Sequence, residues 1–227
     1  MILPFLSEGE HADPDDFPPV HRALTEPNGL LAVGGDLSLS RMVCAYKRGI
    51  FPWFGAGDPV LWWAPDPRTV LTPAGFHLSR SLAKWRRQQR YRITVNKAFA
   101  DVVAGCAAPR SDQDGTWIVP DMLKVFIELH EAGHGYSIEI WDGVQLVGGL
   151  FGAKFGRAAF GESMFSRVPN ASKLALAAIL IDQRWGEIDF LDCQFTTTHL
   201  LSLGAEEWSR SLFNKRLATS IATRPGD

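Results

Sequence analysis

Beyond about residue 78, hydrophobic and polar positions follow one another with the periods of helices and strands. Two segments that alternate every two residues flank Asp142-Gly143, a dipeptide that strongly favours the turn of a β-hairpin. A long apolar run that begins at Asn170 or Ser172, either of which can cap a helix, has helical spacing. The expected elements are helices at 79–89, 97–106, 120–130 and 170–181, strands at 91–95, 136–141, 145–151, 157–165 and 188–192, and a helix in the tail.

The first 75 residues lack sustained periodicity, and proline and glycine interrupt them near both ends. One short helix is expected there, capped by Ser38 or Ser40 and ending at Gly49. We therefore predict a small irregular N-terminal domain over residues 1–75 and a mixed α/β (α+β) domain over residues 76–227. In the second domain a hairpin leads into a central strand, a helix and another strand, which is the order of the acetyltransferase-like (GNAT-type) fold. In that fold a ligand enters where the central strands splay apart.

The 227 residues, of which 46% are apolar and 21% charged, suit a soluble globular protein with a sizeable core. We expect it in the cytoplasm, since the N-terminus lacks the basic region and the cleavage site of a signal peptide. We expect no membrane contact, because no run of about eighteen apolar residues occurs. Cys44, Cys106 and Cys193 are scattered, a spacing that favours neither a disulfide framework nor a cysteine metal site.

The net charge of −2 argues against a protein whose whole surface binds nucleic acid, but the cations are unevenly placed. Six of them lie between Arg80 and Arg92 with no acidic residue among them. Such a cluster is most often the solvated face of a helix. On a nearly neutral protein it is also typical of local phosphate binding, so both interpretations stay open.

Polar residues interrupt two of the predicted strands. Glu162 stands where the alternation of residues 161–167 would place a core side chain. Asp192 and Gln194 follow an apolar run, and side chains two residues apart on a strand point to the same face. A carboxylate and an amide that emerge from such a run must be hydrogen-bonded or used in chemistry, because burying them unpaired is costly. A satisfied structural pair and a functional pair both fit this pattern.

One segment matches a metal-binding pattern. His130-Glu131-Ala132-Gly133-His134 reads H-E-x-x-H, the pattern of zinc proteases. That chemistry needs both histidines on one face of an unbroken helix. Gly133 and Gly135 flank His134 and a strand is expected from residue 136, so we expect the helix to end inside the motif. A zinc metalloprotease stays as an alternative that bound zinc would identify, and we expect no metal ion.

Six segments, in one order and spread over nearly the whole chain, resemble the bacterial leucyl/phenylalanyl-tRNA–protein transferases. They are EPNGLLAVGGD (26–36), YKRGIFPWF (46–54), LWWAPDPR (61–68), GTWI (115–118), GESMFSR (161–167) and DCQ (192–194). The resemblance implies an enzyme that moves leucine or phenylalanine from its tRNA to the N-terminal Arg or Lys of a protein and so marks that protein for degradation. It also implies a small N-terminal domain on an acetyltransferase-like C-terminal domain.

The resemblance further implies the residues of the site. Asp192 and Gln194 are the pair that orients and assists the attacking amine. An aminoacyl ester is already activated, so the reaction needs no covalent nucleophile, metal ion or cofactor. An apolar pocket in the C-terminal domain would hold the aminoacyl side chain, and the terminal adenosine would stack on tryptophan. The implied substrate-binding residues are Trp53, Trp117, Leu150, Glu162, Leu176, Ile179 and Leu191.

Two pocket positions depart from the family, since Ala159 and Ile179 stand where relatives carry aromatic residues; the preference between Leu and Phe is therefore open. The implied partners are Leu- or Phe-tRNA and proteins that begin with Arg or Lys, and we expect a monomer. A non-catalytic tRNA-binding module, which would bind aminoacyl-tRNA and transfer nothing, is a second alternative. The cations that fall where the family's basic segment meets the tRNA acceptor stem are Arg80, Lys84, Arg86 and Arg87.

Overall fold

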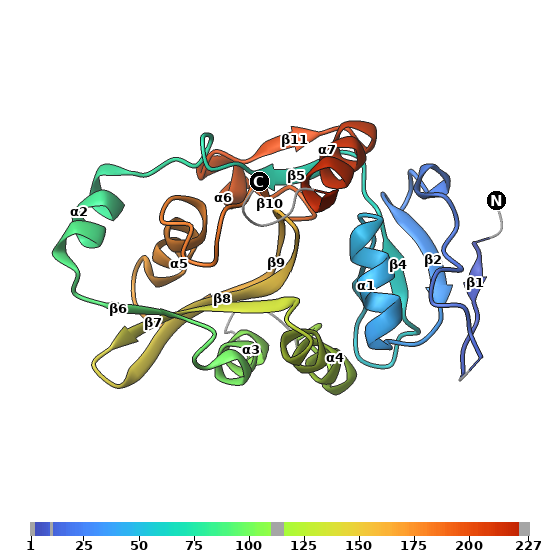
Figure 1. Cartoon of the computed structure of the whole chain (residues 1–227), viewed down its shortest axis with the longest axis horizontal. Helices are drawn as coiled ribbons and strands as arrows, with labels where there is room; N and C mark the ends of the chain where they lie inside the picture. The colour runs from blue at the N-terminus through green and yellow to red at the C-terminus, as the bar shows by residue number, and fades with distance from the viewer. Residues whose placement is uncertain (1–2, 10, 110–115, 223–227) are drawn as a thin grey trace.

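The computed structural model of the chain describes residues 3–9, 11–109 and 116–222. It contains two β-sheets, a four-stranded one built from the N-terminal part and a seven-stranded one built from the remainder (Figure 1). The mixed α/β fold expected from the sequence is confirmed. In the described part of the chain, no helix is both long and apolar enough to cross a membrane.

The N-terminal part is more regular than the sequence predicts. Its four strands pair in the order β1-β2-β4-β3. Each has only two to five residues, too few for the alternation that marks a strand in a sequence. Ser38 accepts a hydrogen bond from the backbone N–H of Arg41, so the predicted helix cap at Ser38 is confirmed. The elements are β1 (Phe5–Leu6), a 3₁₀ turn η1 (Val20–Arg22), β2 (Leu30–Gly34), α1 (Leu39–Lys47), β3 (Phe51–Pro52) and β4 (Leu61–Trp63).

The large sheet has the strand order β11-β5-β10-β9-β8-β7-β6. Every helix and strand predicted beyond residue 78 is present, with ends shifted by a few residues, whereas β5, β11 and α6 were not predicted. β5 precedes residue 75 and yet pairs in the large sheet. The strands are β5 (Arg68–Leu71), β6 (Arg92–Val95), β7 (Gly135–Asp142), β8 (Gln145–Phe155), β9 (Ala158–Ser166), β10 (Phe190–Asp192) and β11 (Glu206–Trp208). The helices are α2 (Arg80–Gln88), α3 (Phe99–Ala107), α4 (Pro120–Glu131), α5 (Ala171–Leu180), α6 (Thr198–Ser202) and α7 (Arg210–Ala222).

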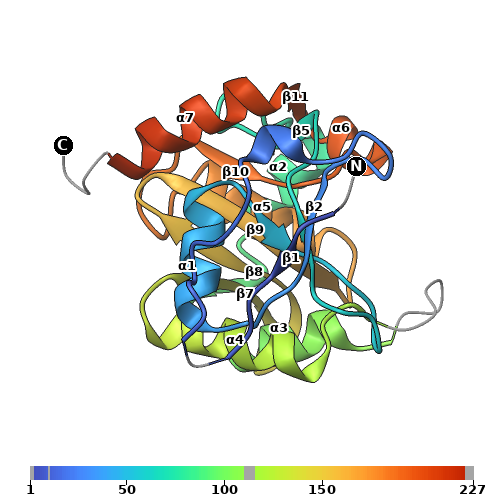
Figure 2. The ribbon, with the colours of Figure 1, turned by 90° about the vertical axis from the view of Figure 1, so that its right-hand side faces the viewer.

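Helices cover both faces of the large sheet around β7, β8 and β9. Figure 1 shows α5 on one side of these strands and α3 with α4 on the other. Figure 2 looks from the side of the N-terminal part, whose α1 and small sheet stand in front of the large sheet, with α7 above and α4 below. One hydrophobic core joins Tyr46 and Trp62 of the N-terminal part to Phe151 and Phe160 of the large sheet. The N-terminal part therefore packs directly on the large sheet.

The two central strands β9 and β10 separate after three paired residues. β10 runs parallel to β9 between Ala158 and Phe160, and β9 then continues to Ser166. Beyond Asp192 the backbone N–H of Cys193 donates to Thr69 O, so the chain turns away from β9 and follows β5. The polar residues that interrupt the predicted strands lie at this gap between β9 and β10.

Candidate active site

Asp192 ends β10 and is fully buried. Both its carboxylate oxygens accept hydrogen bonds from one guanidinium, since Arg68 Nε donates to Oδ1 over 2.8 Å and Nη2 donates to Oδ2 over 2.6 Å. Arg68 is also buried and comes from β5, which pairs antiparallel with β10. A buried carboxylate requires such a partner. Arg68 was not identified as a site residue from the sequence, because 124 residues separate it from Asp192; its place at the end of the family segment LWWAPDPR (61–68) was the available signal.

Gln194 does not share a strand with Asp192, so the prediction that both side chains point to one strand face is wrong. β10 ends at Asp192, and Gln194 has a left-handed backbone conformation with φ of 58°. Its backbone N–H donates to Asp192 Oδ1 over 3.0 Å. With the amide oriented by its hydrogen-bond partners, the side-chain nitrogen donates to Gly161 O and Cys193 O, each over 3.1 Å. This orientation directs the amide oxygen away from these two carbonyls.

Glu162 occupies a β-bulge in β9. Phe151 pairs with Ser163, and the next residue of β8, Gly152, pairs with Gly161, so Glu162 is the extra residue of the bulge. A bulge re-aims a side chain that regular alternation would place elsewhere. This explains why a carboxylate stands at a position where the sequence pattern expects a core residue.

The Glu162 carboxyl group accepts a hydrogen bond from Tyr46 Oη over 2.9 Å. Tyr46 is a buried residue of α1, so the bond links the N-terminal part to β9. Burial, with a smaller contribution from the charge of Asp192, raises the pKa of Glu162 to about 7, although the Tyr46 hydrogen bond and the charge of Arg68 oppose this shift. A carboxyl group with such a pKa can exchange a proton near neutral pH.

Aromatic residues of the N-terminal part pack beside Gln194. Phe195, the next residue in the chain, has its ring 5.5 Å from that of Trp53 and 5.9 Å from that of Trp63. The Trp53 side chain is 44% exposed, so part of its ring is open to solvent. An exposed indole can stack on a nucleic-acid base.

Trp117 stands just before α4, and its ring meets that of Phe126 edge-on with centroids 6.1 Å apart. It is partly buried against the core that also contains Tyr46. Gly115, which precedes it in the predicted motif, lies outside the described residues. Trp117 therefore packs with the α4 side of the molecule, apart from the aromatic group around Phe195.

The predicted pocket residues come together in one hydrophobic cluster beneath α5. They belong to β8, β10 and α5, and each is at most 3% exposed. Ala159 of β9 belongs to the same cluster. Leu191 pairs with Ala159 across β10 and β9, one residue before these two strands separate. The clustered residues are Leu150, Leu176, Ile179 and Leu191.

The predicted basic segment forms α2, which Figure 1 places at the edge of the molecule beyond α5. Leu82 is buried and anchors the helix. Arg86 is partly buried and forms an ion pair with Asp182, so it differs from the rest of the cluster. Three cations of α2 point to solvent, namely Arg80, Lys84 and Arg87.

The H-E-x-x-H segment does not form a continuous helix, as expected. α4 ends at Glu131, and Gly133 adopts φ of 80°. The ring of His130 stacks on Phe99 with centroids 4.2 Å apart, and His134 stacks on Phe155 at 4.7 Å. The two imidazoles therefore pack on different aromatic residues instead of converging on one ligand position.

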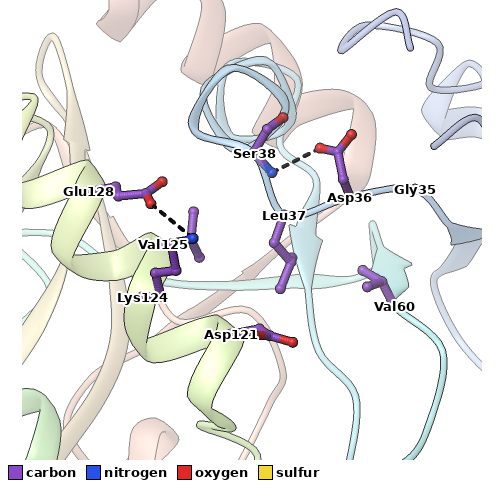
Figure 3. A pocket seen from close by; sticks show the side chains of 9 residues that line it. All are labelled: Gly35, Asp36, Leu37, Ser38, Val60, Asp121, Lys124, Val125 and Glu128. Carbon is purple, nitrogen blue, oxygen red and sulfur yellow. Dashed lines mark hydrogen bonds and ion pairs between the residues drawn. The ribbon is translucent and has the colours of Figure 1, made fainter. Parts of the chain in front are cut away.

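A cleft of about 370 Å³ separates α4 from the loop after β2 (Figure 3). Its polar groups bond partly among themselves, since Ser38 N donates to Asp36 Oδ1 over 2.9 Å and Lys124 pairs with Glu128 at 3.9 Å. Asp121 adds a further carboxylate to its wall. None of the catalytic or substrate-binding residues predicted from the sequence lines this cleft.

Two of the solved structures that match this chain resemble it only distantly. A GCN5-related N-acetyltransferase-like protein from Streptococcus suis is 18% identical and matches 72% of this chain and 61% of its own with a TM-score of 0.36. The C-terminal domain of a putative lysylphosphatidylglycerol synthetase from Agrobacterium fabrum is 11% identical and matches 85% of this chain and 61% of its own with a TM-score of 0.40. These scores are too low for an argument about fold or function.

Sequence comparison is decisive. The model of the leucyl/phenylalanyl-tRNA protein transferase family matches residues 70–218, and the model of that family's N-terminal domain matches residues 35–66. A leucyl/phenylalanyl-tRNA–protein transferase from Ectopseudomonas mendocina is 54% identical over 88% of this chain and 89% of its own length. One from Saccharophagus degradans is 50% identical over 92% of this chain and 86% of its own. The chain belongs to the leucyl/phenylalanyl-tRNA–protein transferase family.

Proposed function

We propose that this protein transfers leucine or phenylalanine from aminoacyl-tRNA to the N-terminal Arg or Lys of an acceptor protein. The observation that carries the proposal is the meeting of Asp192, Gln194 and Glu162 at the gap between β9 and β10, beside the hydrophobic cluster that contains Leu150 and Leu191. We propose that the active form is a monomer, with all these groups supplied by one chain. We place the reaction in the cytoplasm, where aminoacyl-tRNA is made.

The chemistry requires positioning more than activation, since the aminoacyl ester is already reactive. The acceptor amine nitrogen attacks the ester carbonyl carbon, the bond to the ribose oxygen breaks, and the ribose hydroxyl leaves with a proton. The Gln194 amide oxygen, directed away from Gly161 and Cys193, would accept a hydrogen bond from the amine N–H. Glu162, with a pKa of about 7, is suited to hold the amine proton during the attack.

Asp192 has a different part in this proposal. Both its oxygens bond to Arg68, and one of them also accepts the backbone N–H of Gln194. It therefore orients Gln194 and contributes fixed negative charge beside the amine. The cationic side chain of the acceptor requires an acidic partner, and Glu162 is one candidate, because it lies close enough to Asp192 and Arg68 to interact with their charges.

The experiment that tests the donor is transfer to one Arg-initiated peptide from tRNAs charged with Leu, Phe or Val. One additional methylene group bound in an aliphatic pocket stabilises the transition state by about 1–3 kcal/mol. Leucine has one methylene more than valine, so Leu is expected to react about 10–200-fold faster than Val. Phe tests whether Ala159 and Ile179 leave room for an aromatic ring. Equal rates for all three donors would contradict a pocket that selects the aminoacyl side chain.

Replacing Glu162 by glutamine is expected to stabilise the protein at pH 8 and to change its stability little at pH 5. The pKa of Glu162 is about 7 in the folded state and has its ordinary value of 4.5 in the unfolded state. Between these two values the unfolded chain ionises more readily than the folded one, so the free energy of unfolding falls as pH rises from about 4.5 to 7. Glutamine imitates the protonated acid and avoids a loss of about 1–3 kcal/mol. The measurement is urea unfolding at both pH values. The control is Glu131→Gln, an exposed carboxylate at the end of α4, and an equal gain in both variants would contradict the expectation.

A further inference from the structure

Arg68 and Asp192 form an ion pair that stability alone does not explain. Both side chains are fully buried, with at most 2% of either exposed. Taking two charges out of water is expensive, and apolar residues of similar size often give equal or greater stability than a buried ion pair. Such a pair therefore adds little net free energy of folding, but it holds both side chains in one geometry.

The guanidinium of Arg68 lies between two aromatic rings. Its Cζ is 4.6 Å from the ring centroid of Phe51 and 4.6 Å from that of Phe213. Phe51 belongs to β3 of the small sheet and Phe213 to α7, so the slot joins two parts of the fold. A planar cation can stack in such a slot and still present two parallel N–H groups to a carboxylate, which a lysine ammonium cannot do.

The carboxylate of Asp192 in turn holds the backbone of Gln194 in one conformation. Asp192 Oδ1 accepts the Gln194 N–H over 3.0 Å, and the carbonyl oxygen of Gln194 accepts the N–H of Thr69, which follows Arg68, over 3.1 Å. Gln194 holds φ of 58°, a left-handed conformation that is uncommon for a residue other than glycine. Such a conformation persists only where surrounding contacts determine it, and it occurs preferentially at functional sites.

We propose that Arg68 is a positioning residue for the transfer reaction: clamped between Phe51 and Phe213, it fixes Asp192 and thereby the orientation of the Gln194 amide. This inference rests on the proposed function of Gln194. Arg68 itself is buried, and we assign it no direct contact with substrate. The aromatic clamp makes the position of the amide depend on the packing of the small sheet and of α7 against the large sheet.

A double-mutant cycle tests the inference. Arg68→Lys keeps the charge but loses the planar, bidentate contact, and it is expected to lower kcat about 100-fold while KM for Leu-tRNA changes by less than about threefold. Because Arg68 acts through Gln194, the same change made in a Gln194→Ala protein is expected to lower kcat by less than about threefold. Single-turnover transfer to an Arg-initiated peptide measures both effects. Should Arg68→Lys not fold, Arg68→Gln, which keeps a planar donor group, replaces it in the same cycle.

The matched control is Arg41→Lys. Arg41 is likewise fully buried and ion-paired, but its partners are Asp16, Asp36 and the carbonyl of Ser7. It is expected to lower the melting temperature and leave kcat of the folded protein unchanged. An unchanged kcat in Arg68→Lys, or equal losses with and without Gln194, would overturn the role of Arg68 while wild-type transfer still supports the proposed function. A wild-type protein that transfers nothing would overturn both.

Discussion

Replacing Asp192 by asparagine is expected to slow peptide-bond formation about 100-fold or more and to leave the affinity for aminoacyl-tRNA nearly unchanged. Asparagine presents one oxygen and one N–H₂ group to a guanidinium that donates from both its contacting nitrogens, so the bidentate contact is lost. With only one guanidinium contact left, the oxygen that accepts the Gln194 N–H is no longer held in one position. Single-turnover transfer and equilibrium tRNA binding, measured on the same preparation, separate the two effects.

A stability measurement shows whether this loss arises from chemistry or from unfolding. Asp192→Ala would leave the buried Arg68 without a partner and is expected to destabilise the protein by about 3–5 kcal/mol. The double variant Asp192→Leu with Arg68→Met removes both charges and is expected to recover most of that stability without recovering transfer. Wild-type transfer rates in the double variant, or in a folded Asp192→Asn protein, would contradict a functional role for Asp192.

Replacing the three exposed cations of α2 by alanine is expected to weaken tRNA binding about 100-fold at physiological salt. The cations are Arg80, Lys84 and Arg87. Each phosphate contact releases about 0.9 counterion from a duplex, so the slope of log K against log salt is expected to fall by about 2–3. Filter binding of aminoacyl-tRNA over a series of salt concentrations measures both quantities. Transfer at saturating tRNA is expected to proceed at the wild-type rate, because α2 lies away from β10 (Figure 1).

The control for this prediction removes the same charge elsewhere. Lys124 on α4 and Lys215 and Arg216 on α7 are also exposed. Their replacement by alanine is expected to change the salt slope by much less, because they lie outside the basic segment. A third variant, Arg86→Ala, changes the one cation of the predicted cluster that forms an ion pair with Asp182. An α2 variant with unchanged affinity and unchanged slope would show that this helix face is only solvated.

Elements with local signals were predictable from the sequence. The cap at Ser38, the Asp142-Gly143 turn and the glycine that follows α4 each act within a few residues, and each lies where the sequence predicts. The small sheet was missed because its strands are too short to show a period. β5 was missed because its neighbours in the sheet, β10 and β11, come more than a hundred residues later.

The geometry of the site also depends on long-range pairing and was not predictable from the sequence. The sequence indicates Asp192, Gln194 and Glu162 as unusual, but it gives a strand geometry to Gln194 that the structure does not have. The left-handed turn at Gln194 depends on Asp192 and on the contact with Thr69 of β5, both of which require the assembled sheet. The bulge at Glu162 depends in the same way on pairing with β8. The resemblance to a family identified these residues, and the structure supplies their geometry.

The measurement that tests the central claim most directly uses purified protein, tRNA charged with radiolabelled leucine, and two peptides that differ only in beginning with Arg or with Ala. We expect the label to appear as one added leucine on the Arg peptide and to be absent from the Ala peptide. A Gln194→Ala protein is expected to bind the tRNA and to transfer the label far more slowly. Binding without transfer by the wild-type protein would contradict an aminoacyltransferase, and equal labelling of both peptides would contradict the proposed acceptor.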